Sequence, residues 1–159
     1  MRKRARFCKL RSAGYLLLLL AAGCLAAGYL VRIDTLHIGE DGPVFRVEKG
    51  QIFSLCYIHS MYGVPVTEKF RIDDRGFTLF HVVSSDAALE YFGIESNKEN
   101  NVCRTLTEFS IPRSSIGRHV LSIGHSAIRL EDLAGQGEQI RIRIARMPVI
   151  EYIVKHQWR

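Results

Sequence analysis

The distribution of apolar residues divides the chain into one long uninterrupted segment and a series of short alternating ones. Residues 13–31 are a run of 19 residues without a charged side chain (AGYLLLLLAAGCLAAGYLV). At about 1.5 Å per residue, a helix of this length spans roughly 28 Å, which is close to the thickness of the hydrocarbon layer of a bilayer. A buried core helix would carry a polar stripe, and this run has none. The pattern therefore predicts a transmembrane signal-anchor helix over residues 13–31.

Basic residues gather in front of this run and predict its orientation. Because the cytoplasmic flanks of membrane helices are enriched in Lys and Arg, residues 1–12 are expected to stay in the cytoplasm and residues 32–159 to lie outside it. This predicts a single-pass protein of the inner (cytoplasmic) membrane, with the bilayer as its first partner. Six basic residues precede the first acidic residue, Asp34: Arg2, Lys3, Arg4, Arg6, Lys9 and Arg11.

The same cluster accounts for the formal net charge of +6. The rest of the chain holds 16 basic and 16 acidic residues, so the predicted extracytoplasmic part is formally neutral. A nucleic-acid-binding domain needs its basic patch on the folded part of the chain. The charge distribution therefore predicts no nucleic-acid partner.

Two alternatives to a permanent anchor remain open. A cleavable signal peptide has a shorter apolar region that is directly followed by the cleavage site. The segment from Leu20 to Cys24 loosely resembles a bacterial lipoprotein cleavage box, with Cys24 as the lipidated residue. It departs from the usual box at Ala21, and the sequence stays apolar after Cys24. These departures favour the uncleaved anchor.

Beyond Val31 the pattern changes to short alternating segments that are separated by Gly-rich and Asp-rich turns. A short helix is expected near 87–92, followed by a loop through 97–101, and the tail 149–158 is expected to be a last strand or a docking segment. This pattern predicts a mostly β fold, an antiparallel β-sandwich or a partly closed barrel, preceded by one transmembrane helix. The predicted strands are 33–38, 43–48, 52–60, 64–72, 77–84, 118–123, 126–130 and 138–145.

Signatures of known catalytic sites are absent from the sequence. It contains no zincin-type His pair, no Gly-rich phosphate loop, no Cys-x-x-Cys and no nucleophile elbow. His59 and Ser60 combine a base with a hydroxyl group, but adjacent strand residues point to opposite faces and cannot act on each other. We therefore predict no enzymatic activity and no cofactor, and a hydrolase built on this pair is the weakest hypothesis.

Glu68 is the most informative polar residue, because it lies in phase with the apolar positions of its strand, such as Val66 and Phe70. An unpaired carboxylate on a buried face is costly or takes up a proton, so Glu68 needs a partner. The preceding strand supplies Tyr57 and His59 on one face. We expect Tyr57 directly opposite Glu68 and His59 one diagonal step away.

This cluster has two interpretations. It is either a satisfied buried polar group that fixes strand register, or a site for a small ligand or a metal ion, which His81 and His125 could join. The remaining histidines, His37, His119 and His156, are expected on the surface.

Two cysteines, Cys56 and Cys103, fall in the predicted extracytoplasmic part. An oxidising compartment permits a disulfide between them. Buried thiols that act as small apolar side chains are the alternative, and their spacing does not decide between the two.

The segments FSLCYIHS (residues 53–60) and PVTEKF (residues 65–70) resemble the core motif of the bacterial domain-of-unknown-function family 1850. In that family a Tyr-x-His-Ser segment precedes a Pro-Val-x-Glu-x-Phe segment at this distance. Tyr57, His59, Ser60, Pro65 and Glu68 fall on the matching positions. The resemblance covers most of residues 40–146, and only 53–70 is specific. Where the family usually has a Gly-Ala-Gly-like loop, this chain has the sequence SDAAL.

The resemblance implies a role beside a transporter. Members of the family are typically encoded next to the permeases of tripartite ATP-independent periplasmic (TRAP) transporters, which use solute receptors of the TAXI type. The leading hypothesis is therefore a non-enzymatic, membrane-anchored accessory protein whose partner is such a permease or its solute receptor. The alternative is an extracytoplasmic module that binds a small ligand or a metal.

The predicted topology can be tested with a reporter fused after Arg159. The reporter should be active only in an extracytoplasmic compartment, and the protein should stay with membranes through a carbonate wash because its apolar helix is embedded. A soluble form that starts near Ala27 would contradict the anchor. A diacylated Cys24 would replace the anchor with the lipoprotein alternative.

Overall fold

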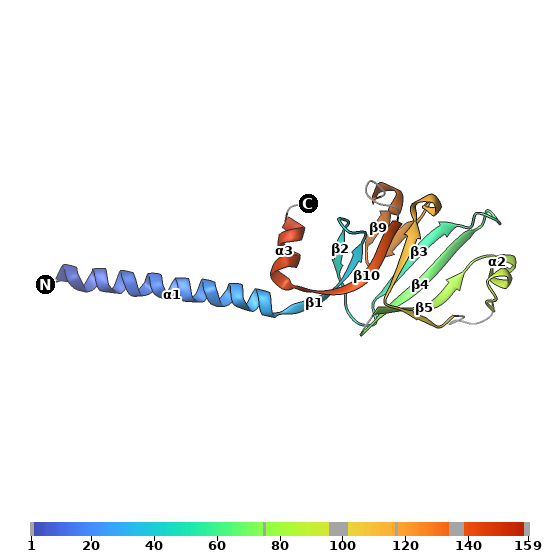
Figure 1. Cartoon of the computed structure of the whole chain (residues 1–159). Helices are drawn as coiled ribbons and strands as arrows, with labels where there is room; N and C mark the ends of the chain where they lie inside the picture. Colours follow the sequence, from blue (N-terminus) through green and yellow to red (C-terminus); the bar gives the residue numbers. More distant parts are fainter. Residues whose placement is uncertain (1, 75, 96–101, 117, 134–138, 158–159) are drawn as a thin grey trace. The chain divides into compact units, whose positions relative to one another are not determined.

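The computed structural model describes the backbone of residues 2–74, 76–95, 102–116, 118–133 and 139–157, and side chains from residue 15 onward, except residue 157, within these ranges (Figure 1). The chain divides into two compact units. One combines Met1–Ile33 with Arg146–Arg159, and the other is Asp34–Ala145.

The first unit is helical. Helix α1 (Arg2–Leu30) includes nearly all of the predicted run, and helix α3 (Val149–Gln157) follows the last strand. The backbone N–H of Val149 donates to the carbonyl oxygen of Val31 at 3.0 Å. A Cβ atom on Gly28 would lie 3.4 Å from Cβ of Ile150, so the two helices meet at this glycine. Of the two alternatives for the tail, a last strand or a docking segment, the strand is wrong, because residues 149–157 are helical.

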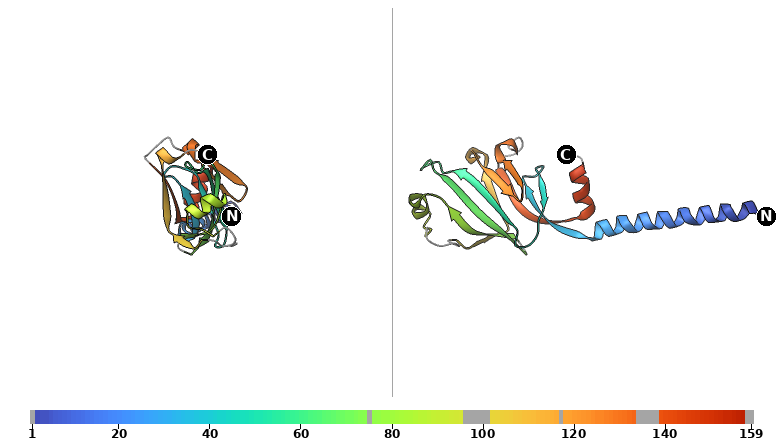
Figure 2. Two further views of the ribbon diagram at one scale, coloured as in Figure 1. Left: turned by 90° about the vertical axis from the view of Figure 1, so that its right-hand side faces the viewer. Right: turned by 180° about the vertical axis from the view of Figure 1, so that it is seen from behind.

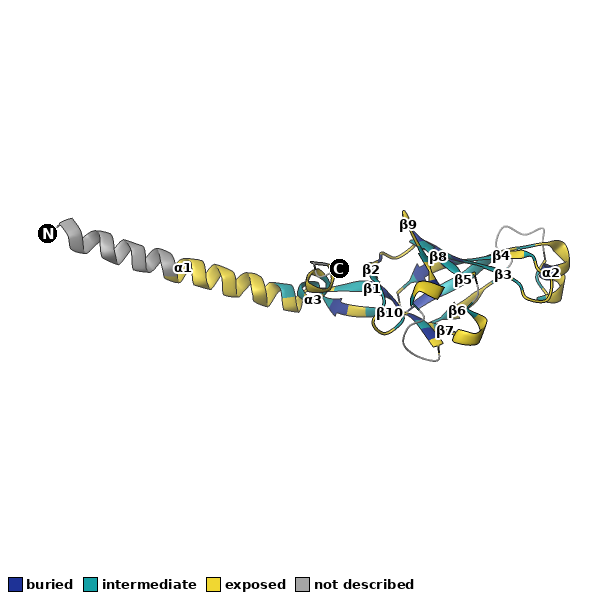
Figure 3. Ribbon diagram, turned by 90° about the horizontal axis from the view of Figure 1, so that it is seen from above, coloured by how far each residue is buried: buried dark blue, intermediate teal, exposed yellow. Residues whose placement is uncertain are grey.

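Among the described residues no helix, α1 included, is both long enough and apolar enough to cross a bilayer. Figure 3 shows that the described side chains of α1 are mostly exposed.

The second unit is built from two antiparallel sheets, as predicted for the fold class. The four-stranded sheet has the order β2-β1-β10-β7 and the six-stranded sheet has the order β6-β5-β4-β3-β8-β9 (Figure 1). The first consists of β1 (Arg32–Ile38), β2 (Val44–Arg46), β7 (Glu108–Pro112) and β10 (Gln139–Pro148). The second consists of β3 (Ile52–Ile58), β4 (Pro65–Asp73), β5 (Gly76–Val83), β6 (Arg104–Leu106), β8 (Val120–Ile123) and β9 (Ser126–Arg129).

All eight predicted strands are present, and two strands were missed. The missed strands, β6 and β7, lie in the irregular stretch between 85 and 115, where no clear alternation marks them. The predicted short helix is confirmed as α2 (Asp86–Tyr91), which begins after Ser85, whose hydroxyl oxygen accepts a hydrogen bond from the N–H of Ala88. The predicted loop at 97–101 lies outside the described residues. Two short 3-10 helices complete the described elements, η1 (Arg113–Ser115) and η2 (Leu130–Leu133).

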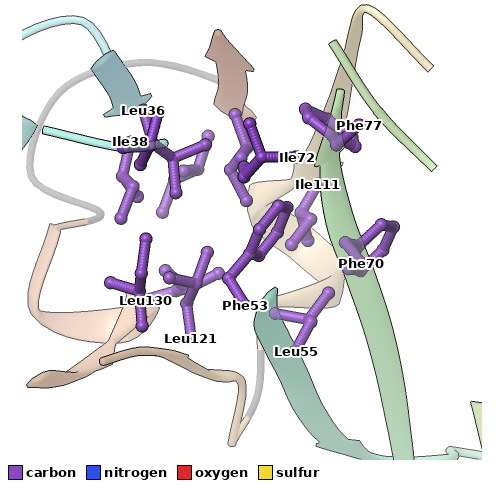
Figure 4. Packing of buried hydrophobic residues seen from close by; sticks show 14 residues of the cluster. Leu36, Ile38, Phe53, Leu55, Phe70, Ile72, Phe77, Ile111, Leu121 and Leu130 are labelled. Atoms are coloured by element: carbon purple, nitrogen blue, oxygen red, sulfur yellow. The ribbon is translucent and has the colours of Figure 1, made fainter. Parts of the chain in front are cut away.

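Both sheets contribute to one hydrophobic core (Figure 4). Leu36 and Ile142 come from the four-stranded sheet, and Phe53 and Leu121 come from the six-stranded sheet. The ring of Phe53 stacks on that of Phe70, with 4.8 Å between centroids. The described strands form two sheets and no closed barrel.

His37 is buried, so the prediction that it lies on the surface is wrong. The hydroxyl group of Thr35 donates to the carbonyl oxygen of Ala145 at 2.8 Å, which ties β1 to β10. Nε2 of His37 lies 3.0 Å from the same hydroxyl oxygen. Because that oxygen already donates its proton, it accepts from His37, which places a proton on Nε2.

Candidate functional site

The β3–β4 hairpin carries Tyr57, His59 and Glu68, the three polar residues that were expected to lie together. In the observed register Leu55 lies opposite Glu68, and Tyr57 lies opposite Val66. Tyr57 is therefore the diagonal neighbour of Glu68, one step from the predicted pairing. The side chain of Tyr57 is long enough to reach this diagonal neighbour. Its hydroxyl group donates to Oε1 of Glu68 at 2.9 Å. The predicted partnership of Tyr57 with Glu68 is confirmed, and the predicted register was wrong by two residues.

Burial dominates the electrostatics of this pair. It raises the pKa of the Glu68 carboxyl group above the ordinary value of 4.5, and the hydrogen bond from Tyr57 opposes part of that effect. Burial also raises the pKa of the Tyr57 hydroxyl group, and the charge of Glu68 raises it further. The Tyr57 hydroxyl group therefore stays protonated as a donor, and Glu68 acts as its acceptor.

A third side chain, that of His119, completes the cluster. The imidazole of His119 stacks on the ring of Tyr57, with 5.0 Å between centroids and 13° between planes. Nδ1 of His119 is buried and has no hydrogen-bond partner among the described residues. Burial lowers the pKa of this imidazole below 6.5, so its neutral form is favoured. We call Tyr57, Glu68 and His119 the polar cluster.

His119 was expected on the surface, and the structure shows it half-buried. The signal that could have identified it is its phase in the sequence. His119 lies two residues before Leu121 and four before Ile123, which are both buried on the core face of β8. A residue at this spacing continues the same face.

His59 does not belong to the polar cluster. Strand β3 ends at Ile58, and the N–H of His59 donates to the carbonyl oxygen of Val64 at 2.8 Å, so His59 starts the turn of the hairpin. Its Nδ1 atom accepts from the N–H of Tyr62 at 3.4 Å. In the described part of the chain Glu68 is bonded to Tyr57, and no hydrogen bond joins it to His59.

The ring of His59 instead belongs to a group of aromatic side chains. Its centroid lies 5.4 Å from that of Tyr62, 5.9 Å from Tyr91 and 5.2 Å from Phe92. Tyr91 and Phe92 come from α2 and its C-terminal cap, so this helix packs beside the turn of the β3–β4 hairpin (Figures 1 and 2). We call His59, Tyr62, Tyr91 and Phe92 the aromatic tip. Sequence patterns carry no signal for this contact, because His59 and Tyr91 are 32 residues apart along the chain.

The other motif residues lie at the edges of these two groups. Ser60 is exposed in the hairpin turn, next to the aromatic tip. Pro65 is exposed at the start of β4, and its carbonyl oxygen accepts a hydrogen bond from the hydroxyl group of Ser84 at 2.9 Å.

The two cysteines of the candidate disulfide lie in different surroundings. Cys56 and Cys103 are both free in this structure. The thiol of Cys56 lies 3.4 Å from the hydroxyl oxygen of Thr67 on the neighbouring strand. Cys103 is exposed.

The histidines proposed for a metal site do not come together. Within the described residues, no group of three His, Cys, Asp or Glu side chains is arranged to hold a metal ion. His81 lies beside Phe80 and keeps its Nδ1 atom buried without a described partner. His125 is exposed in the turn between β8 and β9.

Comparison of the chain with known protein families, with curated proteins and with solved structures finds no match. The resemblance to family 1850, and the transporter association that it implies, therefore stay predictions.

The bond between Tyr57 and Glu68 can be tested with a double-mutant cycle in the full chain. Tyr57→Phe should lower the free energy of unfolding by about 1–3 kcal/mol, because it leaves a half-buried carboxylate without its donor. The double variant with Tyr57→Phe and Glu68→Ala should lose less stability than the sum of the losses of the two single variants. Combining His59→Ala with Glu68→Ala is the control, and these effects should add. Additive effects for Tyr57 and Glu68 in denaturant unfolding would contradict the pairing.

Glu68→Gln should change how stability depends on pH. The pKa of Glu68 is raised in the fold. Between pH 4.5 and the raised pKa, the folded chain therefore keeps a proton on Glu68 that the unfolded chain has lost. Relative to the Gln variant, the native chain therefore loses stability as pH rises through this window. The measurement is denaturant unfolding of both chains from about pH 4 to 7. Glu108→Gln, at an exposed position on β7, is the control and should follow the native chain. Parallel curves for Glu68→Gln and the native chain would contradict the expected shift.

Proposed function

We propose that this chain is a non-enzymatic accessory protein, tethered to the extracytoplasmic face of the inner membrane by α1, that docks a membrane transport protein through its aromatic tip. The two sheets of the second unit form a β-sandwich in this proposal. The resemblance to family 1850 supports a TRAP-type permease or its solute receptor as the partner.

The observation that carries the docking role is the exposure of apolar side chains around the hairpin turn. Tyr62 is 40% exposed, Tyr91 57%, Met61 65% and Ile58 44%. Tyr62 and Tyr91 contact each other edge to face, with 5.7 Å between centroids, so they form one continuous surface. Exposed clusters of this kind are typical of protein-interaction sites, and Tyr is enriched among the residues that dominate binding energy.

The polar cluster supports binding of a protein more than binding of a small ligand. Glu68 already has a donor in Tyr57, and the ring of His119 covers the Tyr57 ring. Within the cluster the bond between Tyr57 and Glu68 joins β3 to β4 and so helps to fix the position of the hairpin. The hairpin in turn presents Tyr62, which contacts Tyr91 of α2.

The anchoring role of α1 is supported by its side chains. The leucines from Leu16 to Leu20 are all more than half exposed, as are Leu25 and Leu30. Such a surface needs an apolar environment, and the basic residues that precede it favour insertion with the N-terminus in the cytoplasm.

The docking role can be tested by purifying the full chain from membranes and identifying the proteins that accompany it. A Tyr62→Ser, Tyr91→Ser double variant should lose the partner, because removing a binding hot spot costs about 2 kcal/mol, or roughly 30-fold in affinity. Ile52→Ser is the matched control, since Ile52 is a 48% exposed apolar residue at the other end of β3. The control should retain the partner. Equal recovery of a TRAP permease or receptor with both variants would contradict docking through the aromatic tip, and its absence from native samples would contradict the partner.

A further inference from the structure

Helix α3 has two chemically different faces. At about 100° per residue, the four aliphatic residues of α3 fall on one arc, and Glu151, Tyr152, Lys155 and His156 fall on the opposite arc. On the polar arc, Lys155 and Glu151 form an ion pair at 3.4 Å, and the rings of Tyr152 and His156 lie 4.6 Å apart. The apolar arc consists of Val149, Ile150, Ile153 and Val154.

Two contacts join the start of this apolar arc to α1. Ile150 faces Gly28, and the N–H of Val149 is bonded to the carbonyl oxygen of Val31. The next turn of the arc is left open, since Ile153 is 43% exposed and Val154 is 50% exposed. Ile153 and Val154 are neighbours and lie on the arc opposite the ion pair of Lys155 and Glu151, so this part of α3 is amphipathic.

The position of α3 along α1 indicates what supplies that contact. The uncharged run ends at Val31. The N–H of Val149, the first residue of α3, donates a hydrogen bond to the carbonyl oxygen of this same residue. If α1 enters the bilayer, the point where it leaves the hydrocarbon layer is the point where α3 begins. Tyr29 on α1 is 67% exposed, and Tyr is enriched at the boundary between hydrocarbon and water.

We propose that α3 is an interfacial helix that lies on the extracytoplasmic surface of the membrane, with Ile153 and Val154 inserted at the boundary of the acyl chains. Its polar arc, with Glu151 and Lys155, faces water. This inference rests on the anchor proposed for α1. It adds a second contact with lipid, made by the C-terminal end of the chain.

The test places a fluorescent reporter on each face of α3 in the full chain. The single native tryptophan, Trp158, is replaced by Phe, and one new tryptophan is introduced by Val154→Trp or, as the matched control, by Glu151→Trp. Each chain is reconstituted in vesicles of phosphatidylcholine and phosphatidylglycerol that contain brominated lipid. The Val154→Trp chain should show blue-shifted emission and strong quenching by bromine, and the Glu151→Trp chain should show neither.

Flotation of the vesicles separates failure of the anchor from failure of the interfacial helix. A chain that does not float with the vesicles contradicts both proposals. If the chain floats and bromine does not quench Val154→Trp more than Glu151→Trp, the anchor stands and the interfacial helix is wrong. Blue-shifted emission of Val154→Trp without quenching would assign its surroundings to protein, such as a second copy of the chain, and would also overturn the proposal.

Discussion

The register of the β3–β4 hairpin is the constraint on which both candidate groups depend. Successive strand residues alternate between faces. The pairing of Leu55 with Glu68 therefore determines, for all the side chains of both strands, which face the core and which face solvent. Tyr57 is placed one diagonal step from Glu68, within reach of its carboxylate. His59 is placed beyond the last pair, where the chain turns. A shift by one residue would separate Tyr57 from Glu68 and turn Phe53 out of the core.

The aromatic core and the polar cluster both contribute to this register, in different ways. Phe53 and Phe70 lie directly opposite each other and stack at 4.8 Å, which favours the pairing through apolar contact. A hydrogen bond is more directional than an apolar contact. The bond from Tyr57 to Glu68 therefore discriminates against nearby registers that would keep some apolar contact and strand a half-buried carboxylate.

Local sequence patterns predicted the strands. They did not predict how segments distant in the sequence pack against each other. Period-two alternation located the hairpin, and the phase of Glu68 with Val66 and Phe70 identified a polar residue that needs a partner. The register could not be predicted, because a shift by two residues leaves each side chain on the same face of the sheet and changes only the cross-strand pairs. The aromatic tip could not be predicted either, since it requires α2 to pack beside a turn that is distant in the sequence. The helical tail was missed because a short apolar segment fits a strand or a helix equally well.

The pairing of α3 with the end of α1 has a consequence for the order in which the chain matures. The ribosome makes α1 before the strands of both sheets and α3 after them, so Gly28 and Val31 wait for their partner while the described strands are being made. The sheets can therefore fold before the contact between α1 and α3 exists. A chain interrupted before α3 carries an unfinished first unit even where its sheets have folded.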